Sequence, residues 1–267
     1  MTNAEIGFNE RFGPWAIVTG AGKGVGLAFT TSLLARGVSV AMVDRDGSVV
    51  ETAEQLDAGS ASSVIGIVAD CADPAWIDQM EHELDGREVG LVVANAAASV
   101  VGPFLGLDAQ SRRSMIEVNC TATADLAAWA LPPMVERGCG GLVATSSGSA
   151  LAGTAAVSVY SATKAFILNL CEALAWELAE SNIAVRAVVA PMMDTPGFRS
   201  SDAKQEALMG EPVEPAAVTE MALDSLAGDG DVRCLADPGL EFMAEVPRAE
   251  RSRILSEVTH AMYSDRF

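Results

Sequence analysis

Short runs of apolar residues, many of them β-branched, alternate along the chain with stretches in which apolar residues have helical spacing. The runs lie at 15–19, 38–43, 64–68, 91–93, 142–145, 185–189 and 232–235. Apolar runs of this length are typical of strands buried on both faces. Strands that alternate with helices form a parallel sheet with helices on both faces. The sequence therefore predicts a single α/β domain over residues 1–267, with a doubly wound parallel sheet of about seven strands.

The loop after the first run carries glycines at positions 20, 22, 24 and 26, in the order Gly-Ala-Gly-Lys-Gly-Val-Gly. A helical pattern follows directly, so the loop joins a strand to the N-terminus of a helix. Glycines let the backbone approach a pyrophosphate, and the free N–H groups of the helix face it. We therefore predict a Rossmann-type dinucleotide site that uses Gly20, Lys23, Gly24, Val25 and Gly26.

Asp44 follows the second run and bears on the choice of nucleotide. An acid at this place holds the ribose hydroxyls of NAD and repels the 2′-phosphate of NADP. Arg45 and Lys23 are basic and could instead meet that phosphate. The sequence favours NAD, with NADP as the alternative.

Tyr160 and Lys164 lie four residues apart in a helix predicted over about 159–181, so they share one face of it. A positive charge beside a phenol favours the phenolate and lowers the tyrosine pKa. Such a pair suits a general acid/base that works near neutral pH. Ser147 ends the fifth run, thirteen residues before Tyr160.

The 159–181 helix is apolar nearly all round and must be covered on every side. Because the sheet covers one side only, we predict a homodimer or homotetramer whose contact involves this helix or the one at 109–131. Coverage by the C-terminal segment is the alternative. Pro132-Pro133 is expected to weaken or end the helix that begins near 109.

Several segments outside the strands have recognisable patterns. Asp73-Pro74 predicts an N-cap and first turn of a helix that reaches about residue 84. Residues 191–214 lack a clear period and are expected to form a mobile flap over the carboxyl edge of the sheet. A helix is expected over 215–227 and a turn over 237–239. The amphipathic stretch at about 247–262 predicts a helix that caps the body or lines the pocket.

The formal net charge of −19 argues against nucleic acid and anionic membranes as partners. The cysteines are scattered without Cys-x-x-Cys spacing, which indicates free thiols in a reducing, cytoplasmic compartment. His82 and His260 have no metal-ligand spacing, so no metal site is expected. No apolar run is long enough for a signal peptide or a membrane span.

With these residues in place, the sequence resembles the short-chain dehydrogenase/reductase family, in its compact dehydrogenase branch. Residues 19–26 resemble the family's Thr-Gly-x-x-x-Gly-x-Gly loop, and Asn95-Ala-Ala resembles its Asn-Ala-Gly element. The resemblance implies a catalytic tetrad of Asn119, Ser147, Tyr160 and Lys164. It implies cofactor contacts at the loop glycines and at Asp44, Arg45, Asp70, Cys71, Asn95, Ala96, Tyr160, Lys164, Pro191, Met193 and Thr195.

The same resemblance implies a role for each member of the tetrad. Tyr160 would exchange a proton with a secondary alcohol or ketone while a hydride moves to or from NAD. Lys164 would lower the tyrosine pKa and bind the nicotinamide ribose. Ser147 would hold the substrate oxygen, and Asn119 would hold a water that relays protons from Lys164.

Two departures from the family pattern concern the substrate site. Ala97 stands where glycine is usual, and Met192 replaces the usual glycine after Pro191. We expect an apolar pocket lined by Val100, Val101, Phe104, Leu151, Val157, Met192, Met193, Phe198, Leu208 and Met209. Such a lining favours a bulky apolar alcohol or ketone, such as a hydroxysteroid or terpenoid. The alternatives are a 3-oxoacyl-type reductase and a non-catalytic dinucleotide-sensing protein.

Overall fold

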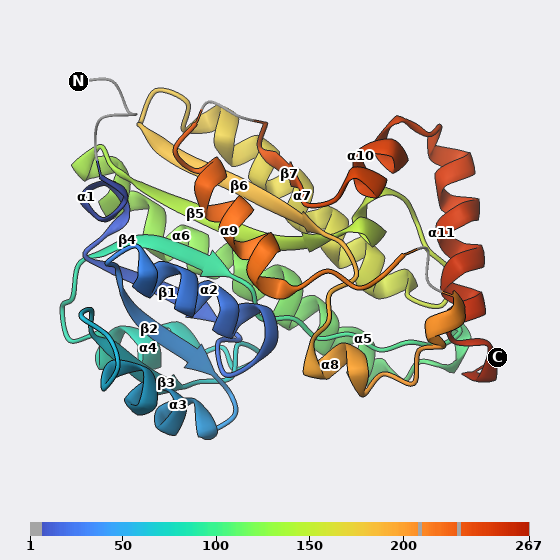
Figure 1. The fold of residues 1–267 in the computed structure, drawn as a ribbon, viewed down its shortest axis with the longest axis horizontal. Helices are drawn as coiled ribbons and strands as arrows, with labels where there is room; N and C mark the ends of the chain where they lie inside the picture. The colour runs from blue at the N-terminus through green and yellow to red at the C-terminus, as the bar shows by residue number, and fades with distance from the viewer. Residues whose placement is uncertain (1–6, 208–209, 229–230, 267) are drawn as a thin grey trace.

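A seven-stranded, entirely parallel sheet forms the centre of the molecule in the computed structural model, which describes residues 7–207, 210–228 and 231–266 (Figure 1). Its strands are β1 (Trp15–Thr19), β2 (Ser39–Asp44), β3 (Val64–Val68), β4 (Val89–Ala94), β5 (Gly140–Ser147), β6 (Ile183–Ala190) and β7 (Arg233–Leu235). The strand order is β3-β2-β1-β4-β5-β6-β7. The predicted doubly wound, Rossmann-type fold is confirmed. Because chain order reverses between β1 and β4, a ligand crevice is expected at their carboxyl ends.

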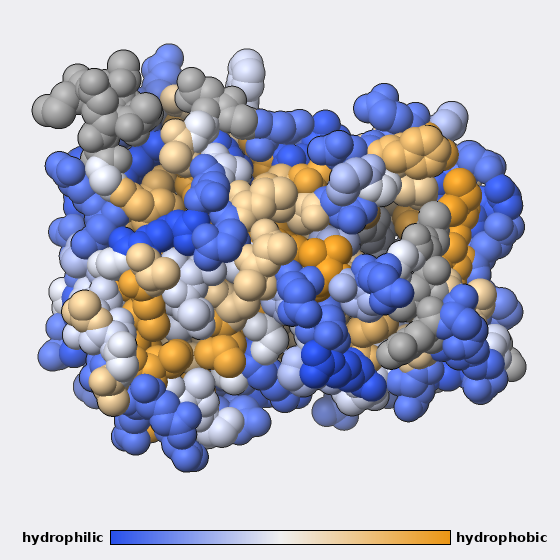
Figure 2. All heavy atoms as spheres, viewed as in Figure 1, coloured by the Kyte–Doolittle hydropathy of each residue, from blue (hydrophilic) through white to orange (hydrophobic). Residues whose placement is uncertain are grey.

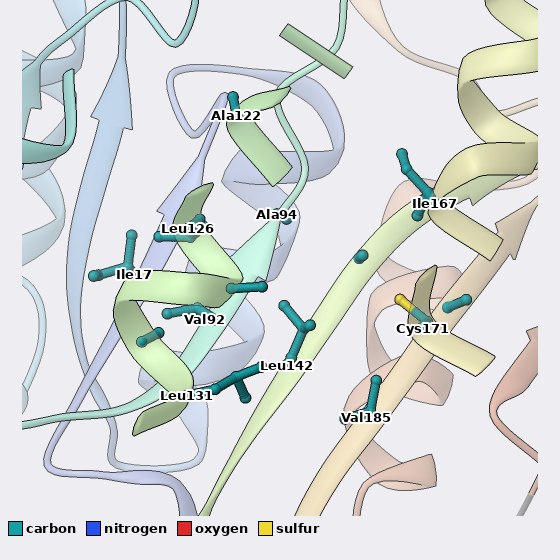
Figure 3. Packing of buried hydrophobic residues seen from close by; sticks show 14 of the residues in the cluster. Ile17, Val92, Ala94, Ala122, Leu126, Leu131, Leu142, Ile167, Cys171 and Val185 are labelled. Atoms are coloured by element: carbon teal, nitrogen blue, oxygen red, sulfur yellow. The ribbon is translucent and has the colours of Figure 1, made fainter. Parts of the chain in front are cut away.

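Helices cover both faces of the sheet. The larger ones are α2 (Gly24–Ala35), α3 (Ser48–Asp57), α4 (Trp76–Leu84), α5 (Ala109–Ile116), α6 (Ala122–Arg137), α7 (Ser158–Glu177), α9 (Pro215–Ser225), α10 (Pro238–Glu245) and α11 (Arg248–Met262). Helices α4, α6 and α7 contribute to the apolar core on one face, and α2, α3 and α9 to the core on the other. Figure 3 shows Leu126 and Leu131 of α6 packed over Val92 of β4 and Leu142 of β5, with Ile167 of α7 beyond them.

The helix expected over 109–131 differs from the prediction in two ways. A π-helical turn at Glu117–Thr121 separates α5 from α6. Pro132 and Pro133 lie inside α6, which continues to Arg137, so the helix does not end there as the sequence allowed. Leu131 and Met134, on either side of the prolines, are buried against the sheet, and this packing holds the helix together where the prolines donate no backbone hydrogen bond.

Other element boundaries also differ from expectation. Helix α4 begins at Trp76 rather than at Pro74, because the Asp73 carboxylate accepts from the Ala75 N–H at 2.9 Å and forms a turn before the helix. Asp237 does more than form a turn: its carboxylate caps α10 by accepting from the Gly239 N–H at 2.6 Å. The short helix α1 (Phe8–Phe12) was also not predicted.

Helices α10 and α11 stand beyond the carboxyl ends of β5 and β6, on the same side as the flap (Figure 1). Residues 191–214, the flap, contain α8 (Pro196–Arg199) and a 3-10 turn at Gln205–Ala207. Figure 2, drawn in the same view, shows hydrophobic surface in the middle of the molecule, between the sheet and α11, while most of the outer rim is hydrophilic. Over the part of the chain that the structure describes, no helix is both long enough and apolar enough to cross a membrane.

Candidate active site

A cleft of about 540 Å³ opens at the carboxyl ends of the strands and is called the nucleotide cleft below. It brings together the predicted cofactor and catalytic residues Gly20, Lys23, Gly24, Val25, Asp44, Arg45, Asp70, Cys71, Asn95, Ala96, Ser147, Tyr160, Lys164, Pro191, Met193 and Thr195. These residues come from the ends of six strands or the loops that follow them, from the first turn of α2 and from α7. Two predicted residues, Gly26 and Asn119, are not among its lining.

The glycine loop is shaped by backbone conformation and by close packing. Gly20 and Gly24 have positive φ angles of 65° and 58°, which side chains other than glycine rarely adopt. A Cβ atom on Gly26 would overlap the Gly20 carbonyl oxygen. Gly26 therefore lets α2 start tightly against the loop, and its place in the site is structural.

Asn95 and Thr19 fix this loop against the sheet. The Asn95 amide donates to the carbonyl oxygens of Thr19 at 3.0 Å and of Gly20 at 3.3 Å. The Thr19 hydroxyl accepts from the N–H groups of Asn95 and Ala96 at 3.0 and 3.1 Å. The loop between β1 and α2 is thus held rigid, as a preformed anion site needs.

Asp44 is held by the backbone around it. Its two carboxylate oxygens accept from the N–H groups of Gly22 at 2.9 Å and Asp46 at 3.0 Å. Lys23 and Arg45 are exposed beside it, and they help the hydrogen bonds of Ser48 to lower the pKa of Asp46. This end of the cleft therefore carries charges of both signs. Burial raises the pKa of Cys71, also in the cleft, to about 12, so Cys71 is a neutral thiol at physiological pH.

Tyr160 and Lys164 project from α7 towards the end of β5, where Ser147 lies. The Lys164 side chain is buried, and its Nζ atom donates to the Thr145 carbonyl oxygen at 2.7 Å. The same Nζ lies 5.7 Å from the centre of the Tyr160 ring. The predicted Tyr–Lys pair therefore does share one side of the helix, at the floor of the nucleotide cleft.

The electrostatics of this pair differ from the expectation. Burial raises the pKa of Tyr160, and its hydrogen bond with Ser147 only partly offsets this effect. Burial also lowers the pKa of Lys164 to about 8. The predicted lowering of the tyrosine pKa by Lys164 is wrong for this structure, because removing the phenol from water disfavours its charged form. Tyr160 is therefore a neutral phenol at neutral pH.

Asn119 lies in the π-helical turn and is fully buried. Its side chain accepts from the Ala98 N–H at 2.7 Å and donates to the Ala98 carbonyl at 2.9 Å. It also donates to the Thr163 hydroxyl at 2.9 Å. Asn119 thus joins the loop after β4 to α7, one residue before Lys164, and positions the site from behind.

A second cavity, of about 890 Å³, adjoins the nucleotide cleft and is called the apolar cavity below. The two share Ser147, Tyr160, Ala190, Pro191, Thr195, Gly197 and Phe198. Among the predicted pocket residues, Val100, Val101, Val157, Met192 and Phe198 line the apolar cavity.

Three other predicted pocket residues lie elsewhere. Leu151 is buried in the core, Phe104 is 53% exposed, and Met193 faces the nucleotide cleft. Periodicity cannot separate a pocket wall from the core, because both are apolar. Leu208 and Met209 lie outside the described residues.

The C-terminal helices supply the part of the wall that sequence reasoning did not specify. Leu240 and Met243 of α10, and Leu255, Val258 and Met262 of α11, line the apolar cavity together with Tyr263. The helical spacing of apolar residues in α11 indicated an apolar face and left open whether it capped the body or lined the pocket. The structure shows that it lines the pocket.

Comparison with curated proteins gives relatives with named activities. 17-beta-hydroxysteroid dehydrogenase type 3 of Mus musculus is 30% identical over 193 residues, which cover 71% of this chain and 63% of that protein. Very-long-chain 3-oxoacyl-CoA reductase of Homo sapiens is 27% identical over 190 residues, which cover 69% of this chain and 61% of that protein. The chain thus matches less than two thirds of the length of each of these relatives.

Solved structures share the fold. A 7beta-hydroxysteroid dehydrogenase superposes with a TM-score of 0.84 at 22% identity, over 94% of this chain and 99% of that one. A short-chain dehydrogenase from Sphingobium yanoikuyae in complex with NADPH has a TM-score of 0.73 at 31% identity, over 79% of this chain and 83% of that one.

The family model described as short chain dehydrogenase matches residues 14–206, from β1 into the flap. Because this match spans well over half of the sequence, the chain belongs to the short chain dehydrogenase family.

Proposed function

We propose that the protein is an NAD-dependent oxidoreductase that interconverts a secondary alcohol and a ketone, with Tyr160 as the general acid/base. One observation carries this proposal: Ser147 and Tyr160 line both the nucleotide cleft and the apolar cavity. A substrate in the apolar cavity and a nicotinamide in the cleft would therefore meet at these two side chains.

The cleft fits a nicotinamide dinucleotide. The rigid glycine loop at the start of α2 suits the pyrophosphate, and Asp44 stands where the adenosine ribose is held in such folds. Thr195 and Pro191 would hold the nicotinamide end. When bound, the dinucleotide supplies or accepts the hydride.

The protein's own groups handle the proton. Because its pKa is raised, Tyr160 is protonated at neutral pH and can donate its proton to a ketone oxygen. Ser147 hydrogen-bonds with Tyr160 and would hold the same oxygen in place. Lys164 contributes a positive charge beneath the ring, and Asn119 positions α7 through Thr163. The proposed relay of protons through a water at Asn119 rests on the family resemblance alone.

NAD is favoured over NADP because the Asp44 carboxylate is fixed at the nucleotide end of the cleft. A 2′-phosphate there would lie against a negative charge. NADP is the alternative. It is supported by Lys23 and Arg45, which line the same end of the cleft as Asp44 and could pair with a phosphate.

The substrate we propose is a bulky apolar alcohol or ketone, such as a hydroxysteroid or a terpenoid. The apolar cavity is large enough for such a molecule, and much of its wall consists of valine, leucine and methionine side chains. The similarity to 17-beta-hydroxysteroid dehydrogenase type 3 supports the same class. The similarity to very-long-chain 3-oxoacyl-CoA reductase supports a 3-oxoacyl substrate as the second candidate.

The test is a panel of steroid, terpenoid and 3-oxoacyl ketones, each assayed with NADH and with NADPH. We expect turnover of steroid or terpenoid ketones with NADH, and none in Tyr160→Phe, which should still bind NADH. Binding of NADH without turnover of any ketone would favour a dinucleotide-sensing protein instead. Preferential turnover of 3-oxoacyl thioesters would select the second candidate.

We also propose a homo-oligomer that buries the outer face of α7. Phe166 is 40% exposed and Trp176 is 86% exposed on this face. The exposed residues Ala162, four positions before Phe166, and Ala173, three positions before Trp176, lie on the same face. Exposed aromatic side chains at this spacing are a feature of contact surfaces. Light scattering of the purified protein should give a dimer or tetramer, and Trp176→Glu should shift it towards the monomer.

A further inference from the structure

The end of the chain is fastened to the flap. The Lys204 backbone N–H donates to the Met262 carbonyl oxygen at 2.9 Å. The Lys204 Nζ atom donates to Ser264 Oγ and to Asp265 Oδ1, each at 2.7 Å. Residues 262–266, called the closing segment below, are thereby held over the apolar cavity.

Tyr263 in the closing segment lines the apolar cavity, as do Ser201 of the flap and Arg266. The Tyr263 hydroxyl lies 3.4 Å from Ser201 Oγ, a long contact that leaves its hydrogen-bonding capacity largely unused. The Arg266 guanidinium lies 5.7 Å from the centre of the Tyr263 ring and donates to the Ser201 carbonyl oxygen at 3.3 Å. These three residues form a polar cluster in a largely apolar wall.

This cluster is separate from the pair that would act on the reacting oxygen. Tyr160 comes from α7 and hydrogen-bonds with Ser147, whereas Tyr263 comes from beyond α11 and faces Ser201. Both phenols nevertheless line the apolar cavity. Arg266 also donates to Asp202 at 3.2 Å, so its charge is partly neutralised. A neutral oxygen acceptor therefore suits the cluster better than an anion.

We propose that Tyr263 is a specificity-determining residue, whose hydroxyl binds a second oxygen atom of the substrate, remote from the carbonyl that is reduced. This inference rests on the proposed function and narrows its substrate class to apolar ketones with a second hydroxyl or carbonyl group. A part-buried donor in a largely apolar wall discriminates between substrates, because a substrate without that oxygen leaves the donor only its long contact to Ser201. The flap and the closing segment together place this donor.

The test uses androstanedione, which has a carbonyl at each end of its ring system, and the two mono-ketones that each retain one of them. Tyr263→Phe should lower kcat/KM for the dione about ten-fold, mainly by raising KM. For each mono-ketone, kcat/KM should change by less than about two-fold. The matched control is Glu257→Gln, which removes an exposed carboxylate paired with Arg253 on α11. This variant should leave kcat/KM for all three ketones unchanged.

A second measurement separates this inference from the proposed function. Binding of the same ketones to the NADH complex is measured by calorimetry in Tyr160→Phe, with and without Tyr263→Phe. Binding of the dione that depends on Tyr263, without turnover in the parent protein, would sustain the inference and reject the proposed reaction. If Tyr263→Phe weakened the binding of all three ketones equally, or weakened the binding of none, the inference would be overturned. Absence of both turnover and binding would overturn both.

Discussion

The side-chain amide of Asn119 donates a hydrogen bond to the hydroxyl of Thr163 at 2.9 Å, and that hydroxyl donates to the Tyr160 carbonyl oxygen at 2.8 Å. The π-helical turn thus reaches the stretch of α7 that lies between Tyr160 and Lys164. Through Ala98, the same amide also holds the loop after β4. Asn119 therefore sets the distance between the two walls of the nucleotide cleft.

Replacing Asn119 with alanine should impair both stability and activity. The change leaves the part-buried N–H and carbonyl of Ala98 without their Asn119 partner, which should lower the free energy of unfolding by about 1–3 kcal/mol. Displacement of α7 should reduce kcat/KM about a hundred-fold. Urea unfolding and steady-state kinetics measure the two effects. Thr163→Val, which spares the bonds to Ala98, is the matched variant and should lower both the free energy of unfolding and kcat/KM by less. Equal losses in the two variants would contradict the role assigned to Asn119.

The pH dependence of ketone reduction follows from Tyr160 and Lys164 of α7. Tyr160, with its raised pKa, stays protonated through neutral pH, while Lys164 loses its charge above its lowered pKa of about 8. We expect kcat/KM for reduction to be level below this pH and to fall above it, because this parameter reports the free enzyme. A profile that rises through pH 8 would show that the Lys164 charge is not needed.

Lys164→Met should abolish turnover and yet stabilise the fold. A lysine whose pKa is lowered from 10.5 to about 8 on folding binds its proton more weakly in the native state. The parent protein should therefore gain stability as pH rises between these values, and the variant should lack this gain. At pH 7 the variant should be more stable by at most about 3 kcal/mol. Unfolding curves at several pH values test this, and a variant that is less stable at every pH would refute it.

The elements that could be predicted from the sequence are those whose pattern is local. The glycine loop, the apolar strands and the Tyr160–Lys164 spacing each carry their meaning within a few residues, and the structure brings them together at one edge of the sheet. The sign of the Tyr160 pKa shift could not be predicted, because it depends on burial by segments distant in sequence. Tyr263 was missed for the same reason: only the docking of the closing segment on the flap brings it into the cavity. The helix does not end at Pro132 and Pro133, because packing of α6 against the sheet outweighs the local preference of proline against helix.

Asp44→Asn should shift the coenzyme preference towards NADPH. The variant removes the negative charge but keeps a side-chain oxygen that can accept from the Gly22 N–H. With Lys23 and Arg45 nearby, the ratio of kcat/KM for NADPH to that for NADH should rise by about ten-fold or more. Asp46→Asn is the matched control, since Asp46 caps the turn at Ser48 and should alter the ratio much less. If the parent protein already prefers NADPH, the assignment of Asp44 is incorrect.

Met192→Gly should change which ketones are accepted, with little effect on the coenzyme. The Met192 side chain lines the apolar cavity, while its carbonyl oxygen accepts from the Val213 N–H at 2.9 Å, a bond that glycine can keep. Loss of the side chain enlarges the cavity beside Ser147 and Tyr160, so kcat/KM for the bulkiest ketones should rise about three- to ten-fold relative to the smallest. Met193→Ala alters the neighbouring side chain, which faces the nucleotide cleft, and should raise the KM for NADH without changing the preference for ketone size. Unchanged size preference in Met192→Gly would mean that another part of the wall selects the substrate.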